Sequence, residues 1–124
     1  MAVFFDPVEP ELIKSLFYGF FQEAGIFFEM ISDDVPIGFY GIRAITDKVC
    51  EISVYSKKIG GFKITKELVL KCLKFPFLLD FEKVFLRAER KKMKMLLCNF
   101  KKHGVHYLFE HKDMYFFEVL PHGK

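Results

Sequence analysis

The sequence contains no tryptophan and no apolar run that approaches the roughly 20 residues needed to span a bilayer. Its first residues lack the basic segment and the long apolar segment of a secretory signal peptide. Its cysteines are Cys50, Cys72 and Cys98, an odd number without a C-x-x-C pair, which favours reduced thiols in a cytosol-like compartment. From these absences we expect a soluble intracellular protein without a membrane segment.

Several catalytic and metal-binding motifs are also missing. There is no G-x-S-x-G, P-loop or H-E-x-x-H motif. His103, His106 and His111 fall within nine positions, but their spacing matches no standard zinc pattern. Polar turn residues explain these histidines more simply, so we expect no metal site.

The sequence is rich in the apolar and aromatic residues that form a hydrophobic core. Hydrophobic residues make up 52% of the 124 and charged residues 28%, and 17 residues are phenylalanine. This composition is typical of a globular chain, and the length fits one domain. We therefore expect residues 1–124 to form a single domain.

Charge is unevenly distributed along the chain. Residues 1–56 carry three lysines and arginines against nine acids, whereas residues 57–102 carry 14 against four. The net charge of +3 therefore hides a strongly basic middle third. Such a segment indicates either an anionic ligand or partner, or the solvated outer faces of two helices.

The first half of the chain predicts a short strand, a turn, a helix and an antiparallel meander of three strands. The helix is indicated by apolar positions at helical period, and the last strand by strict alternation. These elements are expected at residues 2–5, 6–10, 12–24, 26–32, 36–45 and 49–55.

The second half predicts a glycine-rich turn, a helix, a strand, another helix and a hairpin. The first of these helices is expected to follow Thr65 as N-cap and to end by Phe75, because Pro76 cannot continue it. A strand is expected at residues 84–88, and the next helix closes at Gly104. The alternating apolar positions of the hairpin are Val105, Tyr107, Phe109, Tyr115, Phe117 and Val119.

The strand–helix–strand passage in the second half implies one parallel pair of strands. The expected fold class is therefore α/β (α+β), with a mixed, mainly antiparallel sheet flanked by helices.

This order of elements is similar to that of the GNAT acyltransferases, the acetyl-CoA-dependent N-acetyltransferases, over nearly the whole chain. Residues 89–105 resemble the penultimate helix of that family, which ends in a lysine-rich turn, a glycine and a hydrophobic residue. The resemblance implies a GNAT-like fold with acetyl-CoA lying where two neighbouring parallel strands splay apart. It also implies that the pyrophosphate contacts backbone N–H groups of a glycine-rich turn at a helix N-terminus, a natural anion site.

The segment that corresponds to this turn is residues 57–65. It departs from the family pattern, because a bulky phenylalanine stands where a small residue is expected. A turn that only reverses the chain, with lysines for solubility, is the alternative interpretation. The candidate acetyl-CoA-binding residues are Lys57, Lys58, Gly60, Gly61, Phe62, Lys63 and Thr65.

Two residues are candidates for catalysis. Glu51 is either a general base for an acceptor amine or an exposed strand glutamate. Tyr107 either supplies a hydroxyl for the leaving thiolate or is a packing residue with one wet end. The general-acid tyrosine that the family often places four residues before the helix-ending glycine is replaced here by Phe100, which has no proton to give.

A second resemblance is to a family of small head-assembly or DNA-ejection proteins of short-tailed, lambdoid-type bacteriophages. It implies a phage-encoded protein, in the host cytoplasm or associated with the virion, whose partner is a phage structural or host protein. It rests on Gly25-Ile-Phe-Phe-Glu29, Ile37-Gly-Phe-Tyr-Gly-Ile42, Glu51-Ile-Ser-Val-Tyr55, Lys74-Phe-Pro-Phe77 and His111-Lys-Asp-Met-Tyr-Phe-Phe-Glu118.

The last helix offers a basic face to an acidic partner. Few arginines and no base-reading side chains accompany it, so any nucleic-acid binding would be non-specific. Two functions stay open: an acyl-CoA-binding GNAT-like protein with weak N-acetyltransferase activity, and a non-catalytic phage assembly protein that uses the fold for protein or non-specific nucleic-acid interaction. The lysines of the basic face are Lys91, Lys92, Lys94, Lys101 and Lys102.

Overall fold

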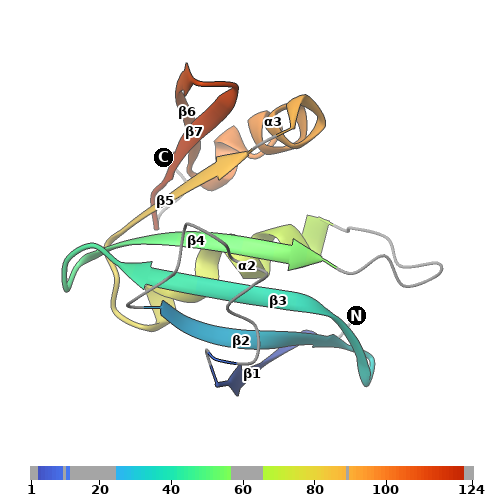
Figure 1. Ribbon diagram of the computed structural model, residues 1–124. Helices are drawn as coiled ribbons and strands as arrows, with labels where there is room; N and C mark the ends of the chain where they lie inside the picture. Colours follow the sequence, from blue (N-terminus) through green and yellow to red (C-terminus); the bar gives the residue numbers. More distant parts are fainter. Residues whose placement is uncertain (1–2, 10, 12–24, 57–65, 89, 122–124) are drawn as a thin grey trace.

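The computed structural model describes residues 3–9, 11, 25–56, 66–88 and 90–121 (Figure 1). The elements are β1 (Val3–Val8), β2 (Gly25–Ser32), β3 (Val35–Ala44), β4 (Val49–Ser56), α2 (Lys66–Leu78), β5 (Lys83–Ala88), α3 (Lys91–Cys98), the 3-10 turn η2 (Lys101–His103), β6 (Val105–His111) and β7 (Met114–Val119).

The described strands form one seven-stranded sheet in the order β1-β2-β3-β4-β5-β7-β6. Every neighbouring pair is antiparallel except β4 and β5, which are parallel and are joined through α2. This confirms both the predicted mainly antiparallel sheet and the predicted parallel pair.

The β2–β3–β4 meander forms where alternation and turn residues predict it. Asp33 and Asp34 both adopt positive φ, 49° and 66°, which short polar side chains tolerate in a tight hairpin turn. In the β3–β4 turn, Thr46 Oγ1 accepts hydrogen bonds from the backbone N–H groups of Lys48 and Val49, each at 3.1 Å. Local turn chemistry therefore sets the register of all three strands.

The predicted turn at residues 6–10 is wrong over its first three positions, because β1 continues to Val8. Pro7 lies opposite Phe28 in the β1–β2 ladder. Since β1 is an edge strand, the missing N–H of Pro7 can face outward at no cost to the sheet. The helix predicted over residues 12–24 lies outside the described residues.

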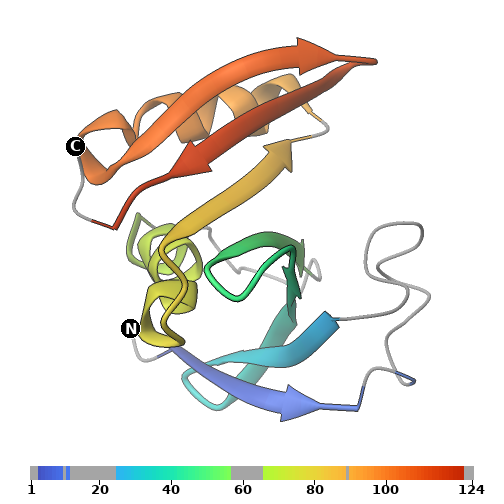
Figure 2. The same ribbon diagram turned by 90° about the vertical axis from the view of Figure 1, so that its left-hand side faces the viewer.

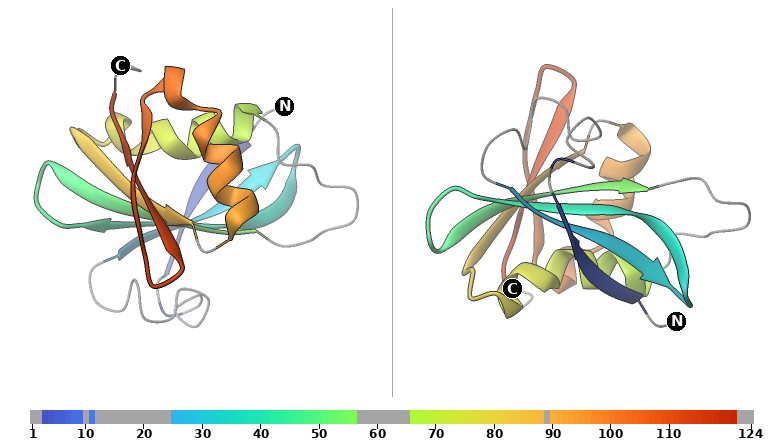
Figure 3. Two further views of the ribbon diagram at one scale, coloured as in Figure 1. Left: turned by 90° about the horizontal axis from the view of Figure 1, so that it is seen from above. Right: turned by 60° about the horizontal axis from the view of Figure 1, so that its bottom comes forward.

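Helices α2 and α3 pack on the same face of the sheet (Figure 3). On β4 the residues that face them are Cys50 and Ile52, both buried, while Glu51 points to the opposite face. An aromatic cluster fills the core under β1–β3. Its members are Phe5, Phe28, Tyr40 and Phe75, with ring centroids 4.5–6.4 Å apart.

The predicted end of α2 at Phe75 is also wrong, because the helix runs through Pro76 to Leu78. A proline removes the N–H that would bond the carbonyl four residues earlier, here that of Cys72. The Tyr40 hydroxyl donates to this carbonyl at 2.6 Å and so replaces the lost helix bond.

The hairpin β6–β7 turns at Lys112 and Asp113, both at positive φ, as predicted. Its alternation is interrupted, however, because the register shifts between Tyr107 and Phe109. Tyr107 faces the helices, whereas Phe109 stacks on Phe116 on the other face, with ring centroids 4.8 Å apart. The bulge at Leu108 therefore corrects the expectation that Tyr107 and Phe109 share a face.

Before this hairpin, η2 ends at Gly104, whose φ of 93° lies in the left-handed region. Gly104 thus closes the basic helical segment as predicted, although a 3-10 turn separates it from α3.

The three cysteines are free thiols. In the described part of the chain, no helix has the length and apolar character needed to cross a membrane.

Candidate functional site

Strands β4 and β5 are paired only at their beginnings. Residues 49–51 pair with residues 83–85, and below them the Lys48 carbonyl accepts the N–H groups of Glu82 and Lys83 at 2.7 and 3.2 Å. No pairing joins the remainders of the two strands, residues 52–56 and 86–88. They diverge in Figures 1 and 2, and we call this opening the β4–β5 fork.

Beyond the fork's base, β4 and β5 each remain paired with the strand on their other side. Strand β4 pairs with β3 from Cys50 to Ser56, and β5 pairs with β7 from Val84 to Ala88. The sheet thus consists of two well-paired halves, which Figure 2 shows spreading apart above and below the start of β5. Backbone N–H and C=O groups at the fork edges are potential partners for a ligand.

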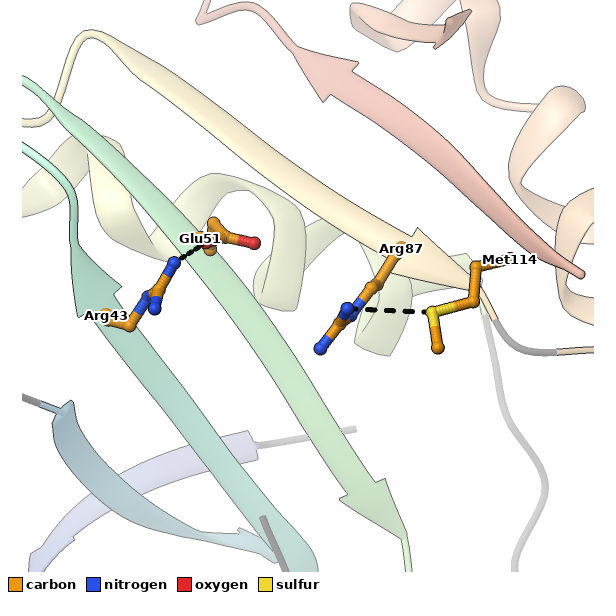
Figure 4. Close-up of polar contacts among 4 residues, drawn as sticks. All are labelled: Arg43, Glu51, Arg87 and Met114. Carbon is orange, nitrogen blue, oxygen red and sulfur yellow. Dashed lines mark hydrogen bonds and ion pairs between the residues drawn. The ribbon is translucent and has the colours of Figure 1, made fainter. Parts of the chain in front are cut away.

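Glu51 is the last residue of β4 that pairs with β5, and it lies at the base of the fork. Its carboxylate forms an ion pair with Arg43, which is directly opposite on β3 (Figure 4). The Glu51 side chain is 17% exposed and the Arg43 side chain 42% exposed. Glu51 is therefore a partly buried, oriented carboxylate with a half-buried arginine beside it, which differs from the alternative of an exposed strand glutamate.

The thiol next to Glu51 is not a nucleophile. Burial, and then the Glu51 carboxylate, raise the pKa of Cys50 to about 12. Burial likewise raises the pKa of Cys72 to about 12, and burial with the neighbouring Cys72 and Cys50 raises that of Tyr40 well above its usual value. Because the thiolate is the reactive form of cysteine, neither of these two buried thiols is a nucleophile.

Tyr107 and Glu51 are not brought together. Tyr107 lies on the edge strand β6, three strands from β4, and faces the helices, whereas Glu51 faces the other way. At about 4.8 Å per strand, their backbones are at least about 14 Å apart. Tyr107 is 41% exposed and packs against Phe117, with ring centroids 5.4 Å apart.

Phe100 occupies the core between α3 and η2. It is 5% exposed, and its ring lies 5.8 Å from that of His103. Phe100 therefore packs the end of α3 against the sheet and leaves this position without an ionisable proton.

The predicted acetyl-CoA-binding turn lies outside the described residues. Helix α2 begins at Lys66, directly after that segment. The candidate residues concerned are Lys57, Lys58, Gly60, Gly61, Phe62, Lys63 and Thr65.

Sequence analysis missed Arg43 and Arg87 as members of this site. Arg87 is on β5, two residues beyond Phe85, and therefore on the same face as Glu51. Figure 4 shows its guanidinium pointing from β5 into the fork, and its Nη1 donates to Met114 Sδ at 3.6 Å. The available signal was an arginine that alternates with apolar residues in the second half of the strand.

The basic helical segment has the expected exposed lysines, with one exception. Lys94 lies over the rings of Tyr107 and Tyr115, with its Nζ 4.9 and 5.0 Å from their centroids. The lysines that remain exposed form what we call the basic α3 surface. Its members are Lys91, Lys92, Lys101 and Lys102.

His103, at the end of η2, has a cationic environment. Partial burial and the ammonium groups of Lys66, Lys102 and Lys74 lower its pKa. Lys74 Nζ donates to the His103 carbonyl at 2.5 Å and to the Leu120 carbonyl at 3.0 Å, so α2 is tied to η2 and to the chain after β7. Among the described residues, no group of three or more histidines, cysteines and acids is arranged to hold a metal.

No protein-family model and no curated protein matches the sequence. Solved structures do match it. The chain is similar to the Campylobacter jejuni N-acetyltransferase PseH in complex with acetyl coenzyme A, with a TM-score of 0.68 and 18% identity over 96% of this chain and 99% of that chain. It is also similar to mutant forms of the spermidine/spermine N-acetyltransferase SpeG from Vibrio cholerae, with a TM-score of 0.69 and 12% identity over 97% and 95%.

An acetyltransferase from Streptococcus agalactiae is a further match, with a TM-score of 0.55 and 13% identity over 89% of this chain and 75% of that chain. At these identities the likeness shows the fold. The chain has a GNAT-like mixed α+β fold, which confirms the sequence-based prediction. The resemblance to a phage family is supported by none of these comparisons and stays a prediction.

Proposed function

We propose that the protein binds acetyl-CoA at the β4–β5 fork and transfers its acetyl group to an amine. The observation that carries this proposal is the end of the parallel ladder at Glu51 and Phe85, which separates the facing edges of two neighbouring strands. The pantetheine arm of CoA contains amide groups, and a strand edge recognises amides as it would another strand. The likeness to PseH, whose structure is in complex with acetyl coenzyme A, supports the same ligand here.

The pyrophosphate would be held by the segment before α2. A helix N-terminus has unpaired N–H groups and a partial positive charge, and α2 begins at Lys66, directly after residues 57–65. The residues assigned to this role in the proposal are Lys57, Lys58, Gly60, Gly61, Phe62, Lys63 and Thr65.

The proposed chemistry needs one proton acceptor from this chain. When bound, acetyl-CoA supplies a thioester whose C–S bond breaks as the C–N bond to the amine forms. Glu51 is at the base of the fork, where it can take the proton that the amine loses, and Arg43 fixes its orientation. Because Phe100 has no proton to donate, the leaving sulfur takes its proton from water and turnover is slow.

Thermal unfolding with and without acetyl-CoA tests binding. A ligand that binds only the folded state raises Tm, and at 100 times Kd it stabilises by about 2.7 kcal/mol. We expect a higher Tm in wild type and in Phe62→Ala, and no shift in the Lys58→Glu, Lys63→Glu double variant. Lys91→Glu with Lys92→Glu makes the same charge change on α3 and should keep the shift. No shift at millimolar acetyl-CoA would contradict the proposal.

The basic α3 surface supports a second candidate function, which we also propose: docking of an acidic protein surface. Helix α3 contains no acidic residue, and Met95, on the same exposed face, is 63% exposed. Exposed cations around an apolar side chain suit a partner that has carboxylates around an apolar residue. The phage assembly role would be one instance of such docking, and it stays a prediction.

A further inference from the structure

Strand β6 forms one edge of the described sheet, and its apolar residues are exposed there (Figure 2). From Val105 to Phe109 it contains no proline, lysine or carboxylate. Leu108 is 42% exposed and Phe109 is 52% exposed. An edge strand has a row of unpaired backbone N–H and C=O groups on its outer side, and charges or prolines usually protect it from pairing with other chains. The edge at β6 lacks this protection and can accept another strand.

The opposite edge of the sheet, at β1, is protected in the usual way. Pro7 has no N–H to donate to an added strand, and Asp6 places an exposed charge in the middle of β1. Pairing of β6 with β1 of another copy would therefore lose a hydrogen bond. Such a head-to-tail contact would also leave one β6 edge open at the end of every assembly. A second β6 strand is the better partner for β6.

The charges at the two ends of β6 are complementary in an antiparallel pairing. The strand is preceded by Lys101 and Lys102 of η2 and has Glu110 near its end. Glu110 lies opposite Tyr115, which packs against the core from the helix face, and η2 follows α3 on that same face. Among the described residues, Glu110 takes part in no ion pair. An antiparallel second β6 brings each Glu110 toward the lysines that precede the other β6, and it does so twice by symmetry.

We infer that the protein forms a twofold-symmetric dimer in which β6 pairs antiparallel with β6 of a second copy. The two seven-stranded sheets then become one continuous sheet. Leu108 is the middle residue of β6, so it lies nearest the twofold axis and meets its own counterpart. The dimer covers the exposed apolar residues of β6 and satisfies the backbone groups of its outer edge. This inference is independent of acetyl transfer.

Sedimentation velocity of the full chain over a range of concentrations tests the dimer. Wild type should change from monomer to dimer as its concentration rises, with no larger species. Leu108→Lys places two like charges side by side at the axis and should raise the Kd of the dimer about tenfold or more. Ile45→Lys is the matched control, because Ile45 is 50% exposed in the β3–β4 turn, and it should leave the Kd unchanged. Far-UV circular dichroism should be the same for all three proteins.

A charge exchange tests the antiparallel arrangement without changing the apolar residues. Glu110→Lys should weaken the dimer, and adding Lys101→Glu should restore it, because the two opposite charges then meet in exchanged positions. Adding Lys48→Glu to Glu110→Lys instead gives the same net charge through an exposed residue of the β3–β4 turn, and it should restore nothing. Equal restoration by Lys101→Glu and Lys48→Glu would show that only net charge matters and would overturn the antiparallel pairing.

Three outcomes for the unmodified edge would also contradict the inference. A monomer at every concentration would show that β6 stays unpaired. Assemblies that keep growing with concentration would indicate an open contact in place of a closed dimer. A dimer of equal strength in wild type, Leu108→Lys and Ile45→Lys would be formed through another surface.

Discussion

The hydroxyl of Tyr40 on β3 donates a 2.6 Å hydrogen bond to the carbonyl of Cys72 on α2, the same carbonyl that Pro76 deprives of its helical partner. Tyr40 is fully buried, and its raised pKa keeps the hydroxyl protonated as a donor. The bond joins the sheet to the helix that leads from β4 to β5, and it explains how a proline is accommodated inside α2.

Tyr40→Phe should destabilise the fold by about 1–3 kcal/mol, because a buried carbonyl loses its partner. Pro76→Ala restores an N–H that can bond Cys72 in the ordinary helical pattern. In the Pro76→Ala background the cost of Tyr40→Phe should therefore be smaller, and a double-mutant cycle measured by urea unfolding detects the difference. Equal costs in both backgrounds would show that Tyr40 does not substitute for the helix bond.

Glu51→Gln should lower kcat of acetyl transfer by about 10²- to 10⁴-fold, the usual contribution of a general base. The acetyl-CoA affinity should stay the same, since the change affects the proton acceptor and leaves the strand edges intact. Steady-state rates together with a binding isotherm provide the check. A variant with wild-type rates would exclude Glu51 as the base.

Because Phe100 stands where a general acid would be needed, we expect a low kcat for acetyl transfer. Phe100→Tyr introduces a phenol at the position where the family often has its general acid, so kcat should rise. Because Phe100 is buried in the core, the added hydroxyl should also lower Tm. Rates of the two proteins at saturating acetyl-CoA, with Tm measured alongside, test this. An ordinary acetyltransferase rate in wild type would show that no acid is missing.

His103 should make stability depend on pH. Its pKa is lowered in the folded state, so below about pH 6.5 the unfolded chain binds the proton more readily and stability falls as the pH falls. The urea midpoint should therefore drop between pH 7.5 and pH 5.5, and His103→Gln should reduce that drop. If both proteins show the same drop, the cationic environment of His103 has no effect on folding.

The basic α3 surface should bind its acidic partner in a salt-dependent way, because exposed charges are screened beyond about 8 Å at physiological ionic strength. Charge reversal at Lys91, Lys92 and Lys102 should reduce binding of an acidic, apolar-centred test peptide and leave Tm nearly unchanged. Lys94 is excluded from this variant because it packs over two tyrosines. Retained binding in the triple variant would show that these lysines only solvate the helix.

Much of the fold could be predicted because local signals and tertiary structure agree. Strands β2, β3 and β4 follow alternation and turn residues, and their bounds differ from the prediction by one residue at most. The predictions that Pro7 lies in a turn and that Pro76 ends its helix were wrong, because the effect of a proline on a strand or helix depends on residues that are distant in the sequence. Pro7 is tolerated at a sheet edge, and Pro76 is tolerated because Tyr40 supplies a donor from 36 positions earlier in the chain.

Within the candidate site, Glu51 could be proposed from its residue type and its strand. Arg43 could also have been predicted as its partner. The two residues are symmetric about the turn at Asp47, so a correct hairpin register pairs them. Arg87 could not be found in this way, because its position depends on where β4 and β5 stop pairing, which the twist of the whole sheet decides. The roles of Glu51 and Tyr107 stay predictions.

A calorimetric titration of the full chain with acetyl-CoA tests the central claim most directly. The account predicts a single binding site that saturates at millimolar ligand or below, and loss of the heat signal in the Lys58→Glu, Lys63→Glu double variant, with Lys91→Glu, Lys92→Glu as the matched control that retains it. Absence of binding heat in wild type at several temperatures would contradict the account.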